Sequence, residues 1–526
     1  MQMQANITPA DVVRLASPRF GWRLVLTLFG VIVAFLGAAS AAHAADRIYW
    51  SNLNGDSISY ANLDGSGGGD LPINPAAIDG PMGLAADTTH GKIYWANYGS
   101  GNPGHAPLGG GTTIGVANID GSDAHVLPIA AGLVSGPHGV AVDATAGNVY
   151  WTNRVNMPAP PSWIGVANLD GNGAHILDVG TATMDGPRGL ALDLNAGRIY
   201  WANYTENTLS WASLKGGTGG DLNPGSATVT NPEGVALDGA GRLFFGNFRD
   251  PPGPGETISY INLNGSGGAD LQTPGANQGD PHGVAIDQST HRIYWPNFDT
   301  GSISYANLDG SGGAELPTPN ATKNGPNLPI LLKSPVPAGT ADIKGSGAPG
   351  AHLRCLGNWA ADQLESLLYQ GPSSQSYSWT ERGKAVAGTS SFHAKKLDEY
   401  RCTVTGTNAA GSNSETGLFA TFKVGPEKLN RAKGTATLFV RVPGPGRLSL
   451  SGKGLAKGRS QRVARATTGL GRKVKRGRAK LVVKPKGKLK QRLARSGKVK
   501  IKTKVVFTPR GGSKATQSKR LTLIRR

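Results

Sequence analysis

The tetrapeptide Tyr94-Trp95-Ala96-Asn97 decides the fold, because close variants of it recur between residues 46 and 333. Six copies pair two aromatic residues with a following Asn, and they begin at Tyr49, Tyr94, Tyr150, Tyr200, Phe244 and Tyr294. An Ala-Asn-Leu-Asp-Gly motif or a relative follows each copy, first at residues 61–65 and last at 306–310. A Gly-(Leu/Val)-Ala-x-Asp motif precedes five of the six copies. Three motifs in a fixed order predict one supersecondary unit repeated six times.

Each unit consists of short alternating runs separated by Gly, Asp and Asn, which is typical of β-strands joined by turns. Four strands fit a repeat of about 49 residues, and six such sheets can bury their faces only against one another. The sequence therefore predicts an all-β chain whose residues 45–333 form a six-bladed β-propeller. The first unit lacks its leading strand, and we expect the apolar run at residues 325–332 to supply it and close the ring.

These units resemble the class B, or YWTD, repeats of low-density lipoprotein receptors, in which Tyr-Trp-Thr-Asp alternates with Leu-Asp-Gly-Ser and Pro-x-Gly-Leu-Ala-x-Asp. The resemblance covers about residues 46–333 and implies a six-bladed propeller. The chain departs from the pattern because Asn replaces Asp in every copy. The resemblance implies a structural role, a tie between neighbouring blades, for Asn52, Asn97, Asn153, Asn203, Asn247 and Asn297. An amide both donates and accepts hydrogen bonds, so it can form such a tie without a charge.

The residue before the glycine of each leading strand changes in chemistry while its surroundings stay constant. Around the predicted ring this position holds Met82, His138, Arg188, Glu233, His282 and Asn327. We expect His138, Arg188, Glu233 and His282 to line a binding site at the mouth of the channel. Two imidazoles and a carboxylate suit a divalent metal, so His138, Glu233 and His282 are candidate ligands; the alternative is a solvated polar rim beside Arg188. A loose resemblance to virginiamycin B lyase and the gluconolactonases implies, as an alternative function, a metal-dependent lyase or lactonase.

A second module follows a Pro/Gly-rich linker predicted at residues 334–350. Cys355 and Cys402 stand 47 residues apart, with Trp379 between them and Tyr400 two residues before the second Cys. This spacing is that of an immunoglobulin-like β-sandwich with an inter-sheet disulfide, a core Trp and a tyrosine corner. We expect this fold over residues 351–425, and it resembles bacterial immunoglobulin-like modules of surface proteins.

Charge divides the chain unevenly. The net charge is +20, yet residues 46–335 hold 25 acids and 11 Lys+Arg, whereas residues 426–526 hold 32 Lys+Arg and a single acid, Glu427. Lysines alternate with mostly apolar residues along residues 498–507, a pattern that predicts a strand with a lysine face. A small basic β domain is therefore favoured over a disordered polycation. We expect anionic envelope polymers or a lipid surface as its partner, and nucleic acid is a poor candidate because too few aromatic residues are available for stacking.

Residues 1–44 have the form of a secretory signal. Three Arg residues precede an apolar run at residues 24–42, which ends at Ala42-His43-Ala44. A retained membrane anchor is the alternative, and both place the rest of the chain outside the cytoplasm. The predicted function is therefore an exported, non-enzymatic envelope protein that binds an extracellular protein or carbohydrate without a cofactor.

Overall fold

The computed structural model describes residues 46–154, 161–248, 256–456, 461–463 and 477–526, so the predicted signal at residues 1–44 lies outside them. The fold is all-β. The described ranges contain one α-helix, α2 (Gly487–Ser496), and two short 3-10 helices, η1 (Pro75–Ala77) and η2 (Leu364–Ser366). None of their helices has the length and apolar character needed to cross a membrane.

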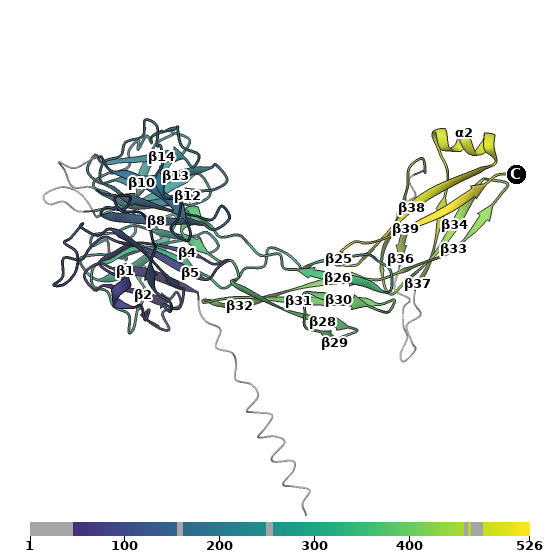
Figure 1. Ribbon diagram of the computed structural model, residues 1–526, viewed down its shortest axis with the longest axis horizontal. Coiled ribbons are helices and arrows are strands. Elements are labelled where there is room, and N and C mark those ends of the chain that lie inside the picture. The colour runs from purple at the N-terminus through teal and green to yellow at the C-terminus, as the bar shows by residue number, and fades with distance from the viewer. Residues whose placement is uncertain (1–45, 155–160, 249–255, 457–460, 464–476) are drawn as a thin grey trace, which may run out of the picture. The chain divides into compact units, whose positions relative to one another are not determined.

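Six antiparallel sheets follow the six repeats, and we call them together the ring (residues 46–333; Figure 1). The first contains β24 (Pro326–Leu332), β1 (Arg47–Asn52), β2 (Ser57–Asn62) and β3 (Gly68–Asp70). The second and third contain β4 (Pro81–Asp87), β5 (Lys92–Asn97), β6 (Thr113–Asn118) and β7 (His125–Val126), then β8 (Pro137–Asp143), β9 (Asn148–Asn153), β10 (Trp163–Asn168) and β11 (His175–Ile176).

The other three sheets repeat this order of strands. The fourth contains β12 (Pro187–Asp193), β13 (Arg198–Asn203), β14 (Thr208–Ser213) and β15 (Gly219–Asp221). The fifth and sixth contain β16 (Pro232–Leu237), β17 (Arg242–Asn247), β18 (Ile258–Asn262) and β19 (Gly268–Leu271), then β20 (Ala285–Asp287), β21 (Arg292–Asn297), β22 (Ser302–Asn307) and β23 (Ala314–Glu315).

The first strands of the sheets contact one another in a closed cycle, from β4 through β8, β12, β16 and β20 to β24 and back to β4. This propeller-like cycle closes because β24 pairs antiparallel with β1, as the missing first strand predicts. The motif Trp side chains pack between the sheets with no exposed surface: Trp50, Trp95, Trp151, Trp201 and Trp295. Burying each indole removes a large apolar area from water, so the repeated motif supplies the core as well as the strands.

A leucine fills the axis of the ring. Four first strands carry Gly at the axis, and Gly283 just precedes the fifth, β20. The backbones pack so closely here that a Cβ on Gly83 would lie 2.7 Å from the carbonyl oxygen of His138. Strand β24 carries Leu328 at this position instead, and the Leu328 side chain lies against Gly189, Gly234 and Gly283. A cavity of only about 10 Å³ remains among these residues. The axis is therefore closed, and a ligand entering the mouth would meet a floor.

The second module contains two facing sheets. One holds β25 (Asp342–Gly345), β26 (Ala351–Leu356) and β30 (Ser391–Ala394), and the other holds β29 (Lys384–Ala387), β28 (Ser374–Glu381), β31 (Glu399–Asn408) and β32 (Gly411–Ala420). The predicted disulfide joins Cys355 of β26 to Cys402 of β31. Trp379 is fully buried beside it, and the Tyr400 hydroxyl donates to the Lys396 carbonyl at 2.9 Å. Strand β25 falls within the segment predicted as a linker.

A loop of the second module extends the first sheet of the ring. After β26 the chain forms η2 and then β27 (Leu368–Tyr369), which pairs in parallel with β24. The Ser366 hydroxyl also donates to the Leu237 carbonyl at 2.6 Å, and Tyr369 is 1% exposed. These contacts between the second module and the ring were not predicted from the sequence.

The basic region forms two further sheets. One contains β33 (Lys423–Asn430), β34 (Thr435–Val442) and β37 (Gly477–Val483), and the other contains β36 (Gln461–Val463), β35 (Gly446–Ser451), β38 (Lys498–Pro509) and β39 (Ala515–Ile524). Helix α2 contacts β38 and is drawn in yellow-green near it in Figure 1. Along β38, buried and exposed side chains alternate, and the exposed set is Lys498, Lys500, Lys502 and Lys504. The strand with a lysine face is therefore as the alternation predicts.

Candidate functional site

The candidate residues lie where the first strands of the ring bulge. In four of these strands the pairing register shifts between the initial Pro and the residue after the Gly, for example between Pro137 and Val140. A bulge bends a strand locally and redirects its side chains. The bulge thus redirects the side chain of the residue before each Gly. In three successive first strands this residue is His138, Arg188 or Glu233.

These three side chains form one buried group, the mouth cluster, together with His282 and Asn327. The Arg188 guanidinium donates from Nη1 to Nε2 of His138. Nη1 also lies 3.5 Å from Oε1 of Glu233, and Nε2 of His138 lies 3.7 Å from Oε2 of Glu233. His138 and Glu233 have no exposed surface, and Arg188 is 7% exposed. A buried acid and a buried cation this close compensate part of each other's desolvation.

His282 occupies the adjoining side of the cluster. Its Nδ1 lies 2.6 Å from Oδ1 of Asn327, the residue at the equivalent position of the sixth strand. Its Nε2 lies 3.4 Å from Oδ2 of Asp280, and its ring stacks on Phe298 with centroids 4.4 Å apart. This histidine is thus oriented by an amide and an aromatic ring, with a carboxylate within ion-pair distance.

The two histidines have opposite pKa shifts. Burial, together with the charges of Arg188, Arg154 and His282, places the pKa of His138 well below its usual 6.5. Burial also opposes charge on His282, but the Glu233 and Asp280 carboxylates outweigh it and raise the pKa of His282. Since a guanidinium only donates, Nε2 of neutral His138 accepts and Nδ1 carries the proton. The cluster thus places a neutral imidazole beside a cation and an anion.

Several buried polar atoms of the mouth cluster have no hydrogen-bond partner. They are Nδ1 of His138, Nε of Arg188, both carboxylate oxygens of Glu233 and Nε2 of His282. Leaving such groups unsatisfied costs about 1–3 kcal/mol each, and more for charged groups. Donors and acceptors are both present, so the cluster suits a ligand group that accepts hydrogen bonds and also donates them.

A second set of residues, which was not predicted from the sequence, surrounds the mouth cluster. These wall residues each follow the motif Asn, and they are Leu53, Tyr98, Arg154, Tyr204, Phe248 and Phe298. Tyr98 meets His138 edge to face at 5.6 Å, and Arg188 lies over the ring of Tyr204 at 4.2 Å. Phe248 lies 5.2 Å from His282. The signal was present in the sequence, because four of six positions after an otherwise constant Asn are aromatic.

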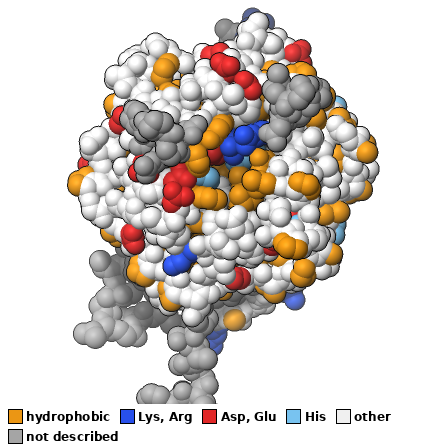
Figure 2. Space-filling model, turned by 90° about the vertical axis from the view of Figure 1, so that its left-hand side faces the viewer, with side chains coloured by type: hydrophobic (Ala, Val, Ile, Leu, Met, Phe, Trp, Pro, Cys, Tyr) orange, Lys and Arg blue, Asp and Glu red, His pale blue; other side chains and the backbone are white. Residues whose placement is uncertain are grey.

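Figure 2 shows a face of the ring that is hollowed near its centre. Hydrophobic side chains surround Lys or Arg and His side chains at this hollow, and acidic side chains lie at its border. This composition agrees with aromatic walls above a floor of Arg and His. Leu328 closes the axis of the ring.

The predicted metal ligands do not converge. Among the described residues, the one group of His, Cys, Asp or Glu whose ligand atoms all lie within 4.8 Å is Asp56, Asp79 and His105, not His138, Glu233 and His282. The lone pair on Nε2 of His138 is also occupied by Arg188, whose positive charge repels a metal ion. The geometry of the mouth cluster favours hydrogen bonding over metal coordination.

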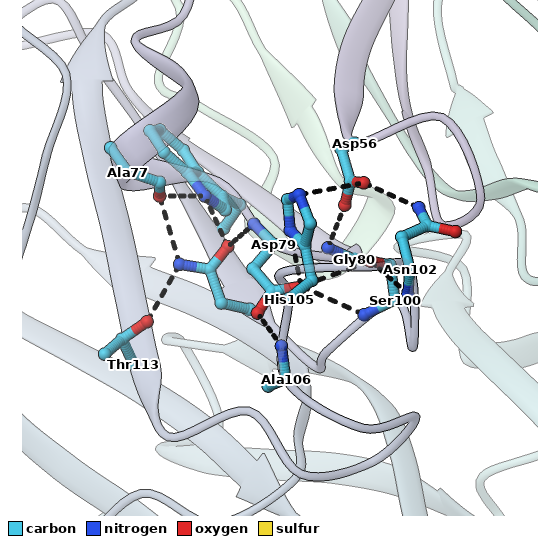
Figure 3. A network of polar contacts seen from close by, with 11 residues as sticks. Asp56, Ala77, Asp79, Gly80, Ser100, Asn102, His105, Ala106 and Thr113 are labelled. Atoms are coloured by element: carbon cyan, nitrogen blue, oxygen red, sulfur yellow. Dashed lines mark hydrogen bonds and ion pairs between the residues drawn. The ribbon is translucent and has the colours of Figure 1, made fainter.

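The Asp56, Asp79 and His105 group is a hydrogen-bonded loop anchor (Figure 3). Asp79 accepts from the backbone N–H groups of Ser100 and Ala106, at 3.0 and 2.9 Å, and Asp56 accepts from the Gly80 N–H at 2.6 Å. These bonds lower the pKa of Asp79 despite its partial burial. Both carboxylates already have donors, so they fix the chain after Asn97 near the wall residue Tyr98.

Five of the six motif Asn residues bond to the segment that arrives from the preceding sheet, whereas Asn297 bonds only within its own sheet and its Oδ1 has no hydrogen-bond partner. Oδ1 of Asn97 accepts from the Asp79 N–H at 3.0 Å, on the segment that arrives from the preceding sheet, and Nδ2 donates to Thr113 at 2.9 Å. Oδ1 accepts a backbone N–H in the same way at Asn52, Asn153, Asn203 and Asn247. Asn297 donates to Ser302 and Ser304. Because each Asn is fixed, so is the backbone of the wall residue that follows it.

Comparison with known proteins finds limited similarity. No family model matches the chain. Protein cueball of Drosophila erecta is 27% identical over 106 residues, which are 20% of this chain and only 15% of the relative's length. A solved structure described as "Crystal structure of Nidogen/Laminin Complex" is similar at 17% identity with a TM-score of 0.42, covering 55% of this chain and 98% of the other.

Proposed function

We propose that the chain is an exported binding protein, in which a six-bladed β-propeller recognises a ligand through the cup formed by the mouth cluster and the wall residues. The observation that carries this proposal is the set of buried polar atoms without hydrogen-bond partners, enclosed by aromatic side chains above a closed axis. Groups that serve stability alone are usually hydrogen-bonded, whereas the Glu233 oxygens and Nε2 of His282 have only ion-pair neighbours, at 3.4–3.7 Å. The ligand is an extracellular protein or carbohydrate that inserts an amide or hydroxyl group into the cup.

The two other parts serve attachment in this proposal. Residues 351–425 form an immunoglobulin-like sandwich, which the disulfide, the buried Trp379 and the Tyr400 hydrogen bond support. The basic domain at residues 426–526 binds an anionic envelope polymer by its excess of 31 positive charges, from 32 Lys+Arg and one Glu. Export is supported by the signal-like residues 1–44 and the disulfide, which an oxidising compartment maintains. N-terminal sequencing of protein recovered outside the cell should then begin at Ala45.

A binding screen tests the cup directly. The full chain is immobilised and probed with arrays of oligosaccharides and synthetic peptides, and ligands retained by the unmodified chain are compared with two wall variants, Tyr204→Ala and Phe248→Ala. Both side chains are half-buried, so truncation removes contact area at the mouth with little effect on the core. We expect each variant to lose about 10-fold or more in affinity, since aromatic anchors dominate binding energy.

Tyr260→Ala is the matched control. Tyr260 is also half-buried and contacts an aromatic ring, Phe244, but it belongs to β18, away from the positions that follow the motif Asn. Its truncation should leave binding within about 2-fold of the unmodified chain. Equal binding by all three variants would refute the cup as the recognition site.

A further inference from the structure

Three cations stand side by side on the exposed face of the sheet β33-β34-β37. Lys423 of β33 lies opposite Arg441 of β34, which lies opposite Arg478 of β37. All three are exposed, and adjacent strands are about 4.8 Å apart. Like charges directly opposite each other destabilise a sheet, so this cation row is unfavourable for the fold alone.

The protein does not neutralise the cation row with an acid. The single acid of residues 426–526, Glu427, pairs with Lys519 of β39 at 2.7 Å. Within the described parts of the chain, no carboxylate forms an ion pair with Lys423, Arg441 or Arg478. The row therefore presents two guanidinium groups and an ammonium group to an external anion.

A pocket and an aromatic ring lie beside the row. A cavity of about 350 Å³ is lined by the three cations together with Gly425, Pro426 and Phe439. The pairing register of β33 shifts between Val424 and Glu427, as in a bulge, so the strand bends at the pocket. Phe439 is 38% exposed, which is unusual for a large apolar side chain in a sheet, and it lies two residues from Arg441 on the same face.

The lysine face of β38 has a like-charge pair, Lys502 opposite Arg520 of β39, but no exposed large hydrophobic side chain on either described strand. Lys500 is also exposed there, opposite Thr522 of β39. The two sheets of the basic domain thus offer a natural comparison between a shaped cationic pocket and a solvated cationic surface.

We infer that the pocket beside Lys423, Arg441 and Arg478 binds an acidic polysaccharide. Guanidinium groups pair with carboxylates through two parallel hydrogen bonds, and the Phe439 ring offers an apolar surface for a sugar ring. A lipid surface is flat and would not enter the pocket, and a nucleic acid needs several stacking side chains. The inference deepens the proposed attachment function and rests on it.

The test compares two double variants that remove the same charge. Arg441→Gln/Arg478→Gln changes the pocket, and Lys500→Gln/Lys502→Gln changes the β38 face. The full chain and both variants are titrated by calorimetry with polygalacturonate, inorganic polyphosphate and phosphatidylcholine vesicles containing phosphatidylglycerol. All four side chains are exposed, and equal unfolding temperatures confirm that the variants are folded.

We expect polygalacturonate to bind the unmodified chain, with a loss of about 10-fold or more in Arg441→Gln/Arg478→Gln and less than about 3-fold in the β38 variant. Phe439→Ala should weaken binding several-fold without changing its dependence on salt, because it removes no charge. Equal losses in both double variants would overturn the pocket while leaving diffuse attachment intact. Preference for polyphosphate or the vesicles would overturn the polysaccharide, and failure to bind any of the three would overturn the attachment function itself.

Discussion

The closed axis of the ring predicts that Leu328→Ala is strongly destabilising. Leu328 is 4% exposed and its side chain touches the backbones of Gly189, Gly234 and Gly283, which have no side chains that can move into the space. Leu→Ala substitutions in cores cost about 2–5 kcal/mol, and the cost rises with the volume of the cavity that remains. Since these three backbone segments are held by three neighbouring sheets and cannot collapse into the space, we expect a loss near the upper end, about 4 kcal/mol in the free energy of unfolding.

The assay is urea unfolding followed by the fluorescence of the ring's Trp residues. Leu328 has a φ of 28°, a conformation that Ala shares at similar cost, so the difference reports the side chain and not the backbone. Leu108→Ala is the matched control, because Leu108 is 58% exposed and its truncation should change stability by less than about 0.5 kcal/mol. A loss of under about 1 kcal/mol for Leu328→Ala would show that the axis is not packed as described.

Three further predictions concern titration, the disulfide and the contact between the ring and the second module. Because the pKa of His138 lies below 6.5, this residue contributes stability that is present above pH 6.5 and lost on acidification. Because the pKa of His282 is raised, this residue contributes stability that is present below pH 6.5 and lost as the pH rises through its folded pKa. NMR titrations of the imidazole resonances, assigned with His138→Gln and His282→Gln, should find His138 neutral and His282 protonated at pH 6.5. The same protonation state for both histidines would contradict the geometry. Replacing Cys355 and Cys402 by Ser opens a loop of 47 residues and should cost about 4 kcal/mol in the transition reported by Trp379; an unchanged midpoint would mean that the bridge is dispensable. Tyr369→Ala should cost about 3 kcal/mol or more and separate the unfolding of the ring from that of the second module, whereas a single unshifted transition would refute a tie through β27.

Much of the ring could be predicted because its motifs repeat. The spacing of the Tyr-Trp pairs gave the sheets, and the truncated first unit required a strand near residue 330, which β24 supplies. The positions of His138, Arg188 and Glu233 followed from one variable site in a constant frame. The lysine face of β38 followed from strict alternation.

Other features depend on packing that a repeat does not encode. Leu328 sits where other copies have Gly, and the irregular sixth strand concealed its role at the axis. The wall residues were not predicted, because the aromatic pair before each Asn is the more obvious pattern and accounts for the buried core. The pairing of β27 with β24 joins residues far apart in sequence, and two residues are too short for a strand pattern. The metal site predicted at His138, Glu233 and His282 depended on distances between side chains, which the sequence does not give. In the structure, Arg188 occupies the lone pair of His138 that a metal would need.

The most direct test of the recognition cup is the dissociation constant of an array-selected ligand for Arg188→Gln. Nε of Arg188 is buried without a hydrogen-bond partner, and a hydrogen bond to a charged group contributes about 1.5–3 kcal/mol, so we expect a loss of roughly 10- to 150-fold in affinity. Tyr260→Ala, measured beside it, should bind like the unmodified chain. Unchanged affinity in a folded Arg188→Gln protein would contradict recognition at the mouth of the ring.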